Sequence, residues 1–129
     1  MSLGDDLSIA QSVAFALLHA LEQEKATVWT EWAHGWLRGD DRSAATAAAA
    51  AEAAASPAGR HAARAAALFD QAQALGTEAA MLTAEGRNAG WSLDNTERHN
   101  TDCLIEAAEA IRLAGGEKAS LRERARQAL

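Results

Sequence analysis

A run of alanine constrains this chain more than any other feature of its sequence. Ten of the twelve residues in Ala44–Ala55 are alanine, and alanine supplies 35 of all 129 residues. Alanine has the highest helix propensity of any residue, so the run predicts a helix, with a low-complexity linker as the alternative. Asp41 or Ser43 can cap its start, and Pro57 ends it, because proline disfavours helix immediately before it.

The residue types that are scarce point to the same fold class. The chain has two Val, three Ile, two Phe and no Tyr, whereas sheets are packed with β-branched and aromatic residues. No segment approaches the roughly 18 consecutive strongly apolar residues of a membrane span, so we expect no membrane partner. We therefore expect a single all-α domain over residues 1–129, folded as an antiparallel helical bundle of four to five helices.

A long N-terminal helix is expected from about residue 5 to residue 38, starting at Asp5–Asp6. Apolar residues recur there at spacings of three or four, with one gap of seven filled by polar residues 22–25. No glycine or proline interrupts the segment before Gly35, which favours one rod about 50 Å long. Two helices broken near 24–27 are the alternative. Such a rod, together with a core built mostly of small alanines, suggests a homodimer or a higher oligomer.

Two further long helices are predicted in the second half of the chain. One runs from about residue 60 to residue 75, where Gly76 ends or bends it, and residues 78–85 continue with a helical composition. After a loop that contains Trp91, Asp94 or Asn95 caps the next helix. It continues to Ala114, and the following pair of glycines stops it.

The distribution of charge restricts the partners that this chain can bind. Eighteen acidic residues against twelve basic ones argue against nucleic acid, whose affinity comes mainly from lysine and arginine. Residues 117–129 are the exception, with four basic and two acidic residues, and are expected to form a short basic helix with a frayed end. A tail that binds an acidic partner is the alternative.

The cysteine content and the first residues indicate the cellular compartment that we expect for the protein. Cys103 is the only cysteine, so no internal disulfide can form, as expected in a reducing cytosol. The acidic start of the chain has no basic segment before an apolar stretch, so we expect no signal peptide and a cytoplasmic location.

Glu31 and His34 are the first candidate metal ligands. Their i, i+3 spacing is the one that ferritin-like bundles use to present an oxygen and a nitrogen to iron or manganese. One such pair needs further carboxylates, so a second subunit would have to complete the site. Glu22, Glu24 and Glu52 are candidates for these further carboxylates. The alternative is that Glu31 and His34 are exposed polar residues beside tryptophans.

His99, Cys103 and Glu106 form a second candidate group, at i, i+4 and i+7 on one helix face with Asp102 beside them. Imidazole, thiolate and carboxylate together can bind zinc, although structural zinc sites use four ligands. A catalytic Cys103 with His99 as its base is a weaker interpretation. The alternative is a cysteine that is simply buried, as free cysteines usually are.

Glu106 and Glu109 also have the E-x-x-E spacing of all-α nucleotide pyrophosphohydrolases, whose carboxylates hold magnesium. Those enzymes need a second acidic pair, and only Glu117 and Glu123 follow here, at the wrong spacing. Because no catalytic constellation is complete, we do not expect an enzyme.

Trp29, Trp32 and Trp36, followed by Leu37, form an aromatic ridge at i, i+3 and i+7. Each tryptophan brings about 150–250 Å² of buriable surface to a chain otherwise filled with alanine. The ridge packs either in the core against small residues or in an interface, since tryptophan is enriched at binding hot spots.

Residues 29–55 read W-x-x-W-A-x-x-W-L-x-G-x-D-R-S and then continue as the alanine run. This segment resembles the opening of alanine-rich helical bacterial proteins of the immunity type. The resemblance implies a non-enzymatic acidic binder of a toxin. The incomplete catalytic patterns, the acidic body and the tryptophan ridge together predict a non-catalytic protein–protein interaction module of bacterial or phage origin. We expect an immunity-type or adaptor protein that binds itself and another protein through the ridge. A carboxylate–histidine metal-binding bundle is the alternative.

Overall fold

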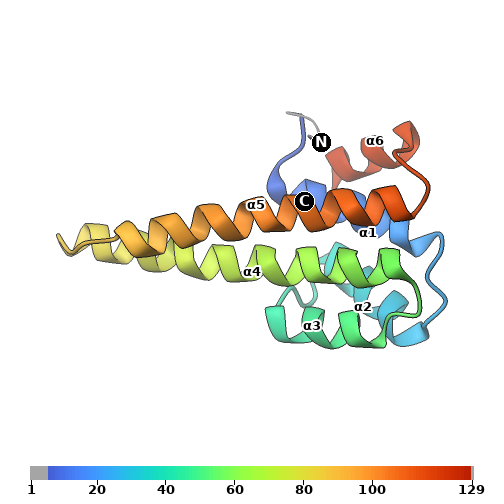
Figure 1. The fold of residues 1–129 in the computed structure, drawn as a ribbon, viewed down its shortest axis with the longest axis horizontal. Coiled ribbons are helices and arrows are strands. Elements are labelled where there is room, and N and C mark those ends of the chain that lie inside the picture. The colour runs from blue at the N-terminus through green and yellow to red at the C-terminus, as the bar shows by residue number, and fades with distance from the viewer. Residues whose placement is uncertain (1–5, 129) are drawn as a thin grey trace.

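The computed structural model describes residues 6–128 and consists over that range of six helices without a strand (Figure 1). The all-α class is confirmed, but the number of helices is larger than the four to five expected. Asp5, expected in the first helix, and Leu129 lie outside the described residues. The helices are α1 (Ile9–Leu21), α2 (Thr27–Arg38), α3 (Ala44–Ala53), α4 (Pro57–Ala84), α5 (Gly90–Leu113) and α6 (Ala119–Gln127).

The prediction of one long N-terminal helix is wrong, because the helix is interrupted between α1 and α2. The alternative prediction of two helices is confirmed. Glu24 explains the break. Its buried carboxylate accepts hydrogen bonds from the backbone N–H groups of Ala26 (2.9 Å), Ala55 (2.8 Å) and Ser56 (2.9 Å), and from the Ser56 hydroxyl (2.8 Å). Burial alone would raise the pKa of Glu24, but these four donors outweigh it and hold the pKa below its ordinary value.

Serine side chains cap the N-termini of three helices. Ser8 caps α1 in a capping box with Gln11, and Ser43, rather than Asp41, caps α3 by accepting from the Thr46 N–H. The alanine run is thus confirmed as a helix. Ser56 caps α4 by accepting from Gly59, and proline occupies the first position of α4, where its missing N–H costs nothing.

The helices α4 and α5 form a long antiparallel hairpin (Figure 1), and three expectations about them are wrong. Gly76 does not end the helix, because α4 continues through it to Ala84 and has 28 residues in all. One glycine costs a helix about 1 kcal/mol, and packing along α5 outweighs that cost. Trp91 lies in α5 rather than in a loop, and Asp94 and Asn95 lie inside the helix rather than at its cap. The predicted stop is confirmed, since the two glycines after α5 have φ values of 105° and 99°.

His19 ties the C-terminal helix to α1. Its Nδ1–H donates to the Phe15 carbonyl (2.9 Å), and its Nε2 accepts from the Lys118 backbone N–H (3.0 Å) just before α6. Burial lowers the pKa of His19, so the neutral ring is the form that fits. Helix α6 itself is confirmed, and Arg122 and Arg126 both bind Asp6.

The molecule divides into two regions, which we call the head and the arm (Figure 1). The head comprises α1, α2, α3, α6 and the parts of α4 and α5 that pack on them. The arm is the rest of the hairpin, residues 71–102, which contributes no residue to the main hydrophobic core. It projects beyond the other helices (Figure 1). All members of the main hydrophobic core belong to the head, and the last polar link to α3 is made by Asp70, which accepts from the Ala44 N–H (2.8 Å). None of the helices within residues 6–128 combines the length and the apolar character needed to cross a membrane.

Candidate functional site

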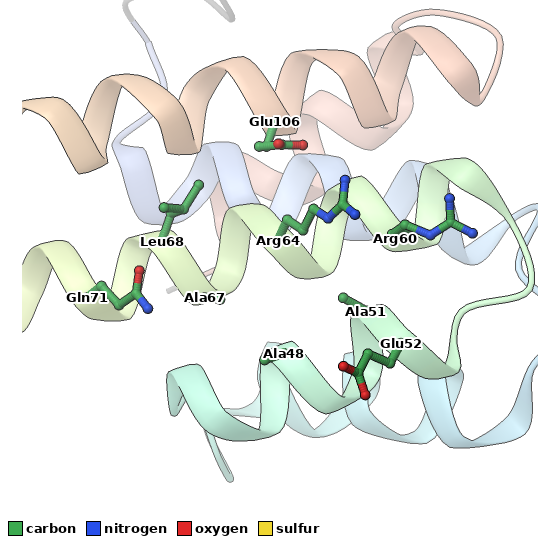
Figure 2. A pocket seen from close by; sticks show the side chains of 9 residues that line it. All are labelled: Ala48, Ala51, Glu52, Arg60, Arg64, Ala67, Leu68, Gln71 and Glu106. Carbon is green, nitrogen blue, oxygen red and sulfur yellow. The ribbon is translucent and has the colours of Figure 1, made fainter.

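A groove of about 500 Å³ lies between α3, α4 and α5 at the edge of the head (Figure 2). Its apolar lining comes from Ala48 and Ala51 of α3 and from Ala67 and Leu68 of α4. The small side chains of Ala48 and Ala51 leave this space open beside α4.

The polar residues of the groove come from all three helices. Arg60, Arg64 and Gln71 project from α4, and the two guanidinium groups are directed to the same side of the helix (Figure 2). Glu52 of α3 and Glu106 of α5 complete the lining. Within residues 6–128, neither guanidinium forms a hydrogen bond or an ion pair.

Glu106 is held in place by a residue that sequence reasoning missed. The Nδ1 of His61 on α4 and the Glu106 carboxylate form a short hydrogen bond, with about a quarter of each side chain exposed. The two residues are 45 positions apart in sequence. The sequence does not show how α4 and α5 are aligned along each other, so it does not predict this contact. Glu106 therefore faces α4.

The exposed apolar residues of the arm form the second candidate site. Met81, Trp91 and Leu93 are 60%, 68% and 56% exposed, whereas the whole head contributes only Val28 and Ile105 to the large apolar residues exposed in the described chain. The residues that the arm does bury are small. They are Ala72, Ala79, Ala89 and Ser92.

The tryptophan ridge does not present a continuous exposed surface. Trp29 and Trp36 are completely buried in the core of a single chain, and the indole N–H of Trp29 donates to the Gly59 carbonyl (2.8 Å). Trp32 and Leu37 are half-buried and pack against the same core. Trp32 lines a shallower groove of about 430 Å³ between α2 and α3. For the two buried tryptophans, the structure corresponds to the core interpretation of the ridge.

Glu31 and His34 are both exposed on α2. No group of three or more His, Cys, Asp and Glu side chains within residues 6–128 is arranged to hold a metal ion. The three other candidate carboxylates lie in different places. Glu22 binds Lys118, Glu24 is occupied by its four donors, and Glu52 lies in the groove. Iron or manganese binding at Glu31 and His34 stays a prediction without a third ligand from this part of the chain.

Cys103 is fully buried, and its thiol donates to the Ala65 carbonyl (3.2 Å). Burial, with a smaller contribution from the nearby Glu106 charge, raises its pKa to about 12. Such a thiol is protonated at neutral pH, whereas the thiolate is the form that acts as a nucleophile and as a zinc ligand. His99 hydrogen bonds to the Asn95 carbonyl (2.8 Å), and Asp102 is exposed. Zinc binding by this group therefore has no support in the geometry.

The two glutamates of the E-x-x-E pattern point to different partners. Glu106 binds His61, and Glu109 binds Arg112 on its own helix. The Arg112 guanidinium lowers the pKa of Glu109, as expected for a carboxylate in an ion pair. A shared magnesium ion would have to displace both pairings.

Comparison with known proteins adds no further information about the site. The chain matches no protein-family model, no curated protein and no solved structure. Any functional inference therefore rests on the arm and the groove.

Proposed function

We propose that this protein is a non-catalytic protein–protein interaction module and that the arm is its binding element. The observation that carries the proposal is the exposure of Met81, Trp91 and Leu93 on a projection that the protein's own core does not use. Large exposed apolar side chains are what interaction surfaces use, and tryptophan and methionine are enriched in such surfaces. The proposed binding tryptophan is therefore Trp91 rather than the ridge of α2, because two of the three ridge tryptophans are buried.

The charge of the arm indicates the kind of partner. Residues 71–102 carry five acidic and two basic residues. Two copies of the arm would repel each other, whereas a protein with apolar pockets and a basic rim would be attracted. An acidic binder of this kind agrees with what the resemblance of residues 29–55 implies for an immunity-type protein.

The experiment compares wild type with an arm variant that combines Met81→Gln, Trp91→Gln and Leu93→Gln. These side chains are exposed, so glutamine can replace them without opening the core. Each protein is used as bait, the captured protein is purified, and its affinity is measured. Because hot-spot residues contribute at least about 2 kcal/mol each, we expect the arm variant to bind at least tenfold more weakly.

Val28→Gln provides the matched control, because Val28 is equally exposed but lies on the head. We expect its affinity to equal that of wild type. A partner that is lost in the Val28 variant but kept by the arm variant would contradict the proposal. So would a wild-type mass of twice 13.5 kDa that returns to 13.5 kDa in the arm variant, since the arm would then bind a second copy.

A further inference from the structure

The groove between α3, α4 and α5 has the features of a small-molecule site. Protein binding through the arm does not account for this groove. Its volume of about 500 Å³ lies within the range of ligand pockets, roughly 300–1,000 Å³. It combines an apolar lining with a few polar side chains that come from three helices (Figure 2). We propose that it binds a small organic phosphomonoester, whose phosphate is held by Arg60 and Arg64.

The two arginines carry the argument for the phosphate. They lie one helical turn apart, so their side chains share one face of α4. Acidic residues outnumber basic ones by 18 to 12 in this chain, yet neither guanidinium has an anionic partner within residues 6–128. Two unpaired positive charges match the charge of a phosphomonoester dianion. The planar guanidinium fork also matches the spacing of phosphate oxygens.

The carboxylates of the groove do not neutralise these arginines. Glu106 is engaged with His61, and Glu52 is exposed on the opposite wall without an ion pair to any described residue. Other arginines of the chain are used differently. Arg38, Arg112 and Arg126, for example, each bind a carboxylate. Unlike these three, Arg60 and Arg64 have no carboxylate partner among the described residues, and they are the two arginines that line the groove.

The rest of the lining indicates the organic part of the ligand. Leu68 and the three alanines offer an apolar surface to a short carbon skeleton. Glu52 can accept hydrogen bonds from hydroxyl or ammonium groups, and the Gln71 amide can both donate and accept. The ligand class is thus a phosphomonoester of a small polyol or amino alcohol.

The test uses glycerol 3-phosphate and ethanolamine phosphate as probes, with glycerol, ethanolamine and inorganic phosphate as references at constant ionic strength. Binding is followed by calorimetry and by shifts of the backbone amide signals. We expect saturable binding of a phosphomonoester, with shifts confined to residues 48–52, 60–71 and the neighbourhood of Glu106. Glycerol and ethanolamine should not bind.

Arg60→Gln and Arg64→Gln should each weaken this binding about tenfold to a hundredfold, the loss expected for hydrogen bonds between charged groups. Arg98→Gln is the matched control, since Arg98 is also exposed and without an ion pair among the described residues but lies on the arm. We expect it to bind the probes as wild type does. Circular dichroism checks that all three variants keep their helices.

Three results would overturn the proposal. The first is the absence of saturable binding of either phosphomonoester up to about 10 mM. The second is equal weakening by Arg98→Gln, which would show a nonspecific charge effect. The third is inorganic phosphate binding as tightly as the esters, which would show that the groove recognises no organic part. The arm variant with Met81, Trp91 and Leu93 replaced should keep phosphomonoester binding, so this site and the protein-binding arm are tested separately.

Discussion

Trp29 in the head and Trp91 in the arm are the same residue type near the starts of two helices, yet their environments are opposite. Trp29 is completely buried, and its indole N–H is satisfied by Gly59. Trp91 is 68% exposed. The difference arises from how many helices converge at each place. Six helices contribute to the head, whereas only two are present in the arm.

Two helices can approach each other closely but cannot enclose large side chains. The residues that the arm buries are small, such as Ala72, Ala79 and Ser92. Its leucines at 75 and 82 are half-buried, and Met81, Trp91 and Leu93 are exposed. The head, by contrast, encloses Phe15, Trp29 and Trp36 completely. Burial in this chain thus depends on the number of packed layers more than on the residue type. The apolar residues of the arm are therefore available to a partner.

Replacing each of these tryptophans tests the comparison most strongly. Trp29→Ala should lower the free energy of unfolding by about 3–5 kcal/mol, because it leaves a cavity in the core. Trp91→Ala should change it by less than about 0.5 kcal/mol, as an exposed site does. Urea unfolding followed by circular dichroism measures both. A cost for Trp91→Ala comparable to that for Trp29→Ala would show that the arm has a core of its own.

Glu24→Gln should have the next largest effect. The amide keeps only one acceptor oxygen where the carboxylate has two, so buried donors of Ala55 or Ser56 lose a partner. We expect a loss of about 2–3 kcal/mol in the free energy of unfolding. Glu78→Gln on the arm is the control, because Glu78 is exposed, and it should unfold as wild type does. Equal stability of the two variants would remove Glu24 as the cause of the break between α1 and α2.

A smaller effect is expected from pH. Burial lowers the pKa of His19 in the folded protein below its ordinary value of 6.5, so the unfolded chain takes up a proton first as the pH falls. The contribution of His19 to the free energy of unfolding is therefore complete above pH 6.5. Below that pH it declines by at most about 1.4 kcal/mol per pH unit. Urea midpoints between pH 8 and pH 5 measure the slope. A free energy of unfolding that rises as the pH falls from 7 to 5.5 would contradict the neutral, doubly hydrogen-bonded ring.

Local signals in the sequence predicted much of the secondary structure. The alanine run, the cap at Ser43, the stop at Gly115 and the basic C-terminal helix all depend on residues within a few positions of one another. The break near Glu24 could not be predicted in the same way. Its cause is a set of donors at Ala55 and Ser56, about thirty residues away.

The candidate sites were predicted less well, because they depend on which helices meet. Glu106 was recognised as a residue of interest, but its partner His61 and the groove with Arg60 and Arg64 exist only where α4 packs beside α3 and α5. The glycine before Trp91 predicts a loop, whereas the structure begins α5 at that glycine, and the pairing with α4 stabilises the helix there.

Hydrogen exchange of the free protein tests most directly whether the chain divides into a self-sufficient head and an arm left for a partner. Exchange rates follow local opening, which is easiest where few apolar contacts hold a segment. We predict that amides in residues 73–100 exchange at least about a hundredfold faster than those in 58–66 and 107–111, a difference of about 3 kcal/mol in opening free energy. Uniform protection along α4 and α5 would contradict this division, because the arm would then be as firmly held as the core.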